Sequence, residues 1–125
     1  MNNAYTSNNY TVYYFELNSD GLEKAIDIFS TMFYNPLFEM SHINKEINAI
    51  NSENQKNLNQ DNWRQYQLIK YLSNPEHPFN KFSTGNYKTL NAITSELLNK
   101  RLKDFFNKFY NTANMRLIIS GRILK

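Results

Sequence analysis

Two short segments of the chain have a pattern of apolar residues that is typical of a strand. Residues 10–17, YTVYYFEL, are rich in β-branched and aromatic residues and place Tyr13, Phe15 and Leu17 on one face, which is the pattern of a strand. Residues 115–123, MRLIISGRI, form a short apolar run. We expect this run to be a second strand that pairs back onto the same sheet.

A helical period of apolar residues follows the first strand and starts again after a proline. The segment NSDGLEKAIDIFSTMF has Asp20 and Glu23 at the spacing of a capping box, and Pro36 ends the predicted helix. The second helix is expected to begin with Ser41 as its N-cap. Its apolar stripe consists of Ile43, Ile47 and Ile50.

Two further segments have the apolar spacing of amphipathic helices. The first covers residues 63–72 and ends before a proline, and the second covers about residues 94–110 with Thr94 or Ser95 as its cap. Between them, residues 73–86 form a loop with two prolines and a glycine, long enough to suggest a function. The order of strand, helices and strand predicts an α/β (α+β) fold with helices on one face of a mixed, mainly antiparallel sheet.

The composition limits the class of protein. A chain of 125 residues with 41% hydrophobic residues can form one compact domain or part of a larger one. It has no cysteine, which excludes disulfides and thiolate metal sites. Its net charge of +3 arises from scattered residues, so we expect no nucleic-acid partner. No uncharged stretch is long enough to cross a bilayer and no targeting signal is visible, so no membrane association is expected and the compartment stays unassigned.

Two glutamates, Glu46 and Glu53, stand seven positions apart in the second predicted helix. Seven residues turn a helix through about 700°, so the two carboxylates share one side and lie about 10 Å apart. The same count puts them at the margin of the buried face, where a carboxylate needs hydrogen-bond donors, a cation or a metal. The alternative is that both edge a solvated face, with Lys45 or Lys56 nearby.

The segment around the two glutamates, KEINAINSENQKN, resembles the glutamate helix of the pitrilysin and insulysin family of zinc peptidases, the inverzincins. In that family an H-x-x-E-H helix supplies two histidine ligands and the general base, and a later helix carries two glutamates at this spacing. The resemblance extends along nearly the whole chain. Its other segments are NAYTS (3–7), YYFEL (13–17), FYNPLFEM (33–40) and WRQYQLIKYLSNPEHPFNKFSTGN (63–86).

The resemblance implies a role for each glutamate. Glu53 corresponds to the third protein ligand of the zinc ion, and Glu46 to a carboxylate that orients the site through a zinc-bound histidine. A zinc site of this kind keeps one position open for water, which the metal activates while it polarises the scissile carbonyl. Zn²⁺ is therefore the cofactor that the resemblance implies for the complete site.

The same resemblance implies contacts with a peptide substrate. It places the first residues of the chain in an edge strand, on which a peptide binds as an added strand. These residues are Asn3, Ala4, Tyr5 and Thr6. Trp63 and Tyr66 resemble aromatic residues that line the pocket just beyond the scissile bond. From the residues alone, the alternatives are a frayed polar N-terminus for the first group and a core anchor at a helix start for Trp63.

The histidine helix of that family has no counterpart in the chain. The sequence contains no H-x-x-E-H, and its two histidines, His42 and His77, are 35 positions apart. Of these, His77 is expected to order its loop and not to bind a metal. We expect residues 1–125 to begin after the histidine helix, as the C-terminal portion of the first domain of an insulinase-type peptidase. A single carboxylate does not hold zinc tightly, so the isolated chain is expected to be inactive.

These inferences combine in one functional hypothesis. In the full-length protein the chain is expected to belong to an insulysin-type zinc metalloendopeptidase that hydrolyses peptides, completed by further domains or a partner subunit. One alternative is a non-catalytic subunit of the same fold, such as a processing-peptidase partner or a respiratory-complex core subunit. Another is a peptide-binding module without metal. The two acids at family spacing argue against the non-catalytic subunit, because an abandoned site has no physical reason to keep them.

Overall fold

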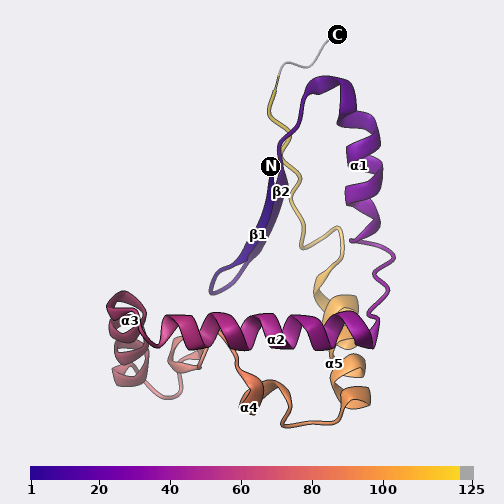
Figure 1. Cartoon of the computed structure of the whole chain (residues 1–125). Coiled ribbons are helices and arrows are strands. Elements are labelled where there is room, and N and C mark those ends of the chain that lie inside the picture. The colour runs from indigo at the N-terminus through magenta and orange to yellow at the C-terminus, as the bar shows by residue number, and fades with distance from the viewer. Residues whose placement is uncertain (122–125) are drawn as a thin grey trace. The chain divides into compact units, whose positions relative to one another are not determined.

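The computed structural model describes residues 1–121, and these form an α+β structure with five α-helices and a two-stranded antiparallel sheet (Figure 1). The elements are β1 (Asn2–Thr6), β2 (Thr11–Phe15), the 3-10 turn η1 (Ser19–Gly21), α1 (Leu22–Thr31), α2 (Met40–Asn57), α3 (Asp61–Leu72), the 3-10 turn η2 (Pro78–Asn80), α4 (Tyr87–Leu90) and α5 (Ser95–Phe109). The chain divides into two compact units. The first consists of residues 1–37 and the segment from residue 106 onward, and the second consists of residues 38–105. None of the helices within residues 1–121 has the length and apolar character that a bilayer crossing needs.

The first unit is built on a hairpin in which Ala4 of β1 lies opposite Tyr13 of β2. The predicted strand at residues 10–17 is confirmed at its centre, where β2 runs from Thr11 to Phe15. The hydroxyl groups of Thr6 and Thr11 lie 3.1 Å apart across the two strands. This side-chain pair closes the ladder next to the turn and helps to fix the register.

Aromatic side chains join the hairpin to α1 on one face of β2. The ring of Phe15 lies 4.8 Å from that of Phe29, and the ring of Tyr13 lies 5.4 Å from that of Phe33, with both pairs in edge-to-face geometry. On the same face, the hydroxyl groups of Tyr13 and Tyr110 are 2.5 Å apart. Residues 13 and 15 share a face because successive strand residues alternate. The expected packing of helices on one face of the sheet is confirmed within this unit.

The start of α1 differs from the predicted capping box. Residues 19–21 form the turn η1, and α1 begins at Leu22 with Gly21 at its N-cap and no side-chain hydrogen bond there. Asp20 is therefore not the N-cap, because it lies within the 3-10 turn, one residue before Gly21. Glu23 still lies in the first turn of α1, where a negative charge interacts favourably with the helix dipole. The helix ends at Thr31, ahead of Pro36.

The second unit contains α2, a continuous helix of 18 residues. It begins one residue before Ser41, with Glu39 as the N-cap residue, so Ser41 is not the cap. A short helix, α4, is fastened to its side: the backbone N–H of Tyr87 donates to Oδ1 of Asn51 at 3.1 Å, and the Tyr87 hydroxyl donates to Oδ1 of Asn48. Asparagine side chains next to the isoleucine stripe thus hold α4 against α2.

The loop at residues 73–86 is held to α3, which ends at Leu72 as predicted. The side-chain amide of Asn80 donates to the backbone carbonyls of Lys70 at 2.9 Å and Ser73 at 3.1 Å. The Lys70 carbonyl, in the last turn of α3, also accepts the backbone N–H of Ser73 at 3.1 Å, and Asn80 adds to this C-terminal cap from the loop. Near the end of the loop, Gly85 has φ +86°, a left-handed conformation that glycine adopts without strain.

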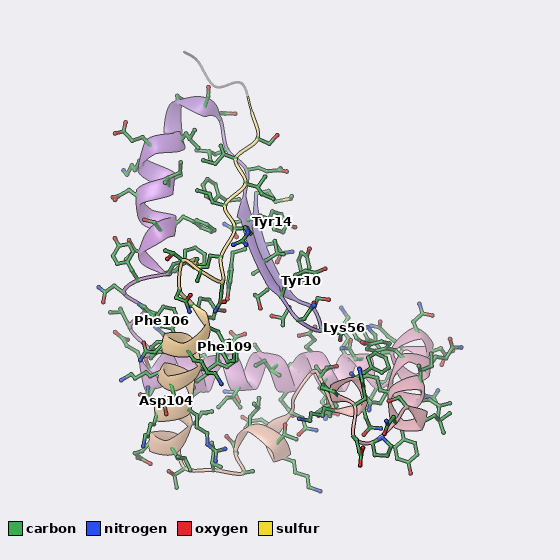
Figure 2. The ribbon with its side chains drawn as sticks, turned by 180° about the vertical axis from the view of Figure 1, so that it is seen from behind. Tyr10, Tyr14, Lys56, Asp104, Phe106 and Phe109 are labelled. Carbon is green, nitrogen blue, oxygen red and sulfur yellow. The ribbon has the colours of Figure 1, made fainter. Side chains whose placement is uncertain are left out.

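The structure confirms the last predicted helix but not the strand predicted after it. The predicted helix at about 94–110 is confirmed as α5, and the hydroxyl of Thr94 accepts the backbone N–H of Leu97 at 3.3 Å as an N-cap. Figure 2 shows Asp104, Phe106 and Phe109 on this helix. The expected strand at 115–123 is wrong over residues 115–121, which have no strand pairing, and residues 122–125 lie outside the described residues. An apolar run becomes a strand only where a partner edge accepts its backbone hydrogen bonds.

The tyrosine pair of the first unit predicts a dependence of stability on pH. Burial and the hydrogen bond to Tyr110 raise the pKa of Tyr13 well above its ordinary value near 10. Because the folded-state pKa exceeds the unfolded one, the stabilisation is complete below about pH 10 and is lost as the pH rises above that value. We expect Tyr13→Phe to lower the free energy of unfolding below pH 10 by about 1 kcal/mol and to flatten its decline above pH 10.

Urea unfolding of the chain on both sides of about pH 10 measures this effect. Tyr71→Phe is the matched control, since Tyr71 is 76% exposed. An equal decline with pH in the wild type and in Tyr13→Phe would show that the pair does not carry the dependence.

Candidate functional site

The two glutamates that the resemblance singles out lie on one continuous helix, α2. The helix period puts Glu46 and Glu53 within about 20° of each other and about 10 Å apart along the axis. Both are exposed, and no described residue forms a hydrogen bond or an ion pair with either carboxylate. The expectation that they lie at the margin of a buried face is therefore wrong within residues 38–105. The chain presents two fixed and unpaired acids on one open side of α2.

The physical reason is the side of α2 on which its neighbour packs. By the helix period, Asn48 and Asn51, which hold α4, lie about 140–200° around the helix from the two acids. The buried residue Ile47 lies between these two sides. Within the second unit, α4 therefore covers α2 away from the acids and leaves Glu46 and Glu53 open.

The histidines do not assemble a metal site with these acids. His77 accepts the backbone N–H of Phe79 through Nδ1 at 3.1 Å, so its predicted role in ordering the loop is confirmed. His42 lies 3.8 Å from the carboxylate of Glu39, and both are exposed. Across residues 1–121 no three histidine, aspartate or glutamate side chains gather closely enough to hold a metal ion. Glu53 suits zinc as one oxygen ligand, but a zinc site needs further ligands.

A groove of about 260 Å³ lies in the second unit where α3 and the loop after it meet the C-terminal part of α2. Trp63 and Tyr66, the two aromatic residues predicted to contact substrate, both line this groove. Their rings are 6.2 Å apart and nearly perpendicular. Trp63 is 42% exposed, so it is no buried core anchor within the described residues. The lining residues are Asn54, Asn57, Leu58, Trp63, Arg64, Tyr66, Gln67, Phe82, Ser83 and Thr84.

Two asparagines of this groove were not predicted. Asn54 and Asn57 are only 7% and 8% exposed, and Nδ2 of Asn57 has no hydrogen-bond partner among the described residues. A signal for them exists in the sequence, since Asn54 follows Ile47 by seven positions and Asn57 follows it by ten. Both positions therefore continue the apolar stripe of the same helix. Buried amides in place of aliphatic residues make this end of α2 polar and indicate a surface for ligand or protein contact.

The predicted substrate strand belongs to the first unit and is described by itself. All of β1 is exposed, and it pairs with β2 along one edge only. Among residues 1–121 no strand pairs with its other edge. β1 is thus a strand with one unpaired edge in the described part of the chain, and the binding of an extended peptide to that edge stays a prediction. The residues in question are Asn3, Ala4, Tyr5 and Thr6.

Comparisons with known proteins place the chain among peptidases. The family model described as Insulinase (Peptidase family M16) matches residues 1–76. The chain is 50% identical over 123 residues to the A-factor-processing enzyme of Saccharomyces cerevisiae. This match covers 96% of this chain and 12% of that protein. It is 43% identical over 125 residues to the putative zinc protease mug138 of Schizosaccharomyces pombe, covering 98% and 13%. It is also 40% identical over 123 residues to the insulin-degrading enzyme of Homo sapiens, covering 96% and 12%.

The matches cover only a small part of each relative. The chain spans about an eighth of the length of the curated relatives that it matches. The described residues contain one face of acids, one aromatic groove and one open strand edge. Within residues 1–121, no histidine, aspartate or glutamate side chains gather with Glu53 to form a metal site.

The aromatic wall of the groove predicts a spectroscopic result. Trp63 is the single tryptophan of the chain, and the edge-to-face ring of Tyr66 shields one side of it. We expect Tyr66→Ala to make Trp63 more accessible, so that acrylamide quenches its fluorescence more strongly. Tyr71→Ala, at a residue 76% exposed on the same helix, should leave the quenching unchanged. Equal quenching in all three proteins would contradict the ring contact.

Proposed function

The chain belongs to the Insulinase family, peptidase family M16, and from this we propose that it is part of a zinc metalloendopeptidase that hydrolyses peptides. The observation that carries the proposal is the pair of unpaired carboxylates at fixed positions on α2, in a chain with relatives of this family along almost its whole length. We further propose that residues 1–125 are the C-terminal portion of the first domain of that enzyme.

In this proposal the two glutamates have different tasks. Glu53 contributes a carboxylate oxygen to the zinc ion, and ligands from elsewhere in the full-length protein complete the coordination. Zinc, when bound, supplies an activated water and polarises the scissile carbonyl. Glu46, about 10 Å away on the same side of the helix, accepts a hydrogen bond from a zinc ligand and so keeps that ligand oriented. Neither carboxylate has a competing partner among residues 1–121, which supports these roles.

Substrate binding in this proposal uses main-chain hydrogen bonds and one side-chain groove. The open edge of β1 offers unpaired N–H and C=O groups to an extended peptide, which gives affinity without a strict sequence requirement. The groove beside Trp63 and Tyr66 receives one substrate side chain next to the scissile bond. Aromatic residues together with a few polar groups are the usual lining of ligand pockets.

The remaining domains of the protein, or a partner subunit, are the proposed neighbours of the chain. Ile47 is the single apolar side chain buried in the described residues, and many large apolar residues are exposed. Among them are Leu68, Ile69 and Leu72 of α3 and Leu117 and Ile118 near the C-terminal end. Exposed apolar surface of this extent indicates contacts with further protein. Without those contacts and the missing ligands, the 125-residue chain is proposed to be inactive.

The main alternative is a non-catalytic subunit of the same family, and a metal-free peptide-binding module is the next. All three share the open strand edge, so β1 does not separate them. The acids do, because a metal site needs carboxylates at fixed positions, whereas the other two candidates have no such requirement. An H-x-x-E-H helix in the full-length protein would favour the peptidase, and a degenerate version of it would favour the alternatives.

The first test of the proposal removes the charge of each glutamate in the full-length protein. Glu53→Gln is expected to lose both bound zinc and peptidase activity, because an amide oxygen is a much weaker ligand than a carboxylate. Glu46→Gln should lower metal affinity and activity by roughly 10–100-fold, the scale of a residue that acts through a ligand.

Glu76→Gln, an exposed glutamate of the loop at residues 73–86, serves as the control for loss of one negative charge. Metal analysis and peptide cleavage are measured for all three variants. Wild-type zinc content in Glu53→Gln would refute the ligand assignment.

A second test uses the 125-residue chain alone. One carboxylate ligand without histidine partners binds zinc weakly, so calorimetry at neutral pH is expected to show no stoichiometric zinc uptake. Tight binding of one zinc ion per chain would mean that other residues of this chain form a site and that Glu53 is not a ligand shared with the rest of the protein.

A further inference from the structure

Lys70 of α3 is the most deeply buried charged side chain of the described residues, with 2% of its surface exposed. Its ammonium nitrogen lies 4.5 Å from the ring centre of Phe79 and 5.4 Å from that of Tyr66. No carboxylate within residues 1–121 forms an ion pair with it. A buried lysine without an acidic partner is unusual, since lysine is almost never fully buried unless its charge is compensated.

The two aromatic rings provide that compensation. The rings of Tyr66 and Phe79 are 6.0 Å apart at an angle of 81°, and the ammonium group lies close to both. A desolvated cation is attracted to the negative face of an aromatic ring, and the attraction grows as water is removed. Phe79 belongs to η2, which Asn80 fastens to the backbone at Lys70. The ammonium group of Lys70 and the ring of Phe79 therefore both contact the ring of Tyr66.

Tyr66 connects this cation to the groove. Its ring lines the groove and meets the ring of Trp63 edge to face at 6.2 Å, whereas Lys70 is not among the lining residues. A continuous series of contacts thus leads from the buried ammonium through Tyr66 to Trp63. Residues 66 and 70 are one turn apart on α3, and residues 63 and 66 are three apart, so one helix carries all three.

We propose that Lys70 is a positioning residue that fixes the ring of Tyr66 and, through it, the shape and selectivity of the groove. This inference rests on the proposed function, in which the groove receives one substrate side chain. The charge is the important property, because the aliphatic stem alone fills the space under the rings without attracting their faces. Loss of the charge leaves Tyr66 free to rotate and widens the range of side chains that the groove accepts.

The test compares two peptides that differ only in phenylalanine or alanine at the position next to the scissile bond. The full-length enzyme is prepared as wild type, Lys70→Met, which keeps the stem but not the charge, and Lys70→Arg, which keeps the charge. Lys100→Met, an exposed lysine of α5, controls for loss of a positive charge. Because the wall of the groove is aromatic, the wild type is expected to prefer phenylalanine, and Lys70→Met is expected to reduce this preference roughly 2- to 10-fold, the scale of one aromatic contact.

This loss should arise from a higher KM for the phenylalanine peptide, with zinc content and kcat for the alanine peptide unchanged. Lys70→Arg should restore most of the preference, and Lys100→Met should behave as wild type. A merely structural role would lower cleavage of both peptides equally, and that result overturns the proposal. An unchanged preference in Lys70→Met overturns it as well.

Two further measurements separate this proposal from the proposed function. If Trp63→Ala alters the preference and Lys70→Met does not, the groove assignment stands and the role of Lys70 fails. If Trp63→Ala has no effect, the groove does not receive the side chain and both fail. Acrylamide quenching of Trp63 in the 125-residue chain needs no activity: Lys70→Met is expected to increase it and Lys70→Arg is not, while equal quenching in both variants contradicts the positioning role.

Discussion

The period of one long helix fixes the relative directions of the candidate groups in the second unit. On α2, Glu46 and Glu53 share one side, the asparagines that bind α4 lie on the other, and Asn54 and Asn57 turn toward the groove. A kink or a break within this helix would separate the acids from one another and from the groove. No proline or glycine interrupts residues 40–57, and the helix is continuous through all of them.

Aromatic rings and polar side chains replace an aliphatic core in this chain. The first unit is joined by Tyr13, Phe15 and their aromatic partners, and the second by asparagine hydrogen bonds and the cation of Lys70 between two rings. Such contacts are directional, so they hold particular side chains in place, but they bury little apolar surface. This balance suits a part of a larger protein in which further contacts supply most of the stability.

The chain belongs to the insulinase family and covers about an eighth of the length of its relatives, and the proposed function gives the acids and the groove a common purpose. A zinc peptidase needs ligands, an activated water and a surface that aligns the peptide. Within the proposal, this chain contributes one ligand, the carboxylate that supports it, a strand edge and a side-chain groove. The same proposal assigns the general base and the remaining ligands to other parts of the protein.

The sequence by itself determined the elements whose signals are local. The alternation at residues 11–15, the period of α2 and the cap at Thr94 depend on neighbours a few positions away, and the spacing of Glu46 and Glu53 follows from the helix period. Tertiary structure decided whatever depended on distant partners. It left the run after Met115 without a strand edge and the two acids exposed, and it buried Lys70 between rings that the sequence places 4 and 9 residues away. Periodicity shows which face a residue occupies, but only packing decides what covers that face.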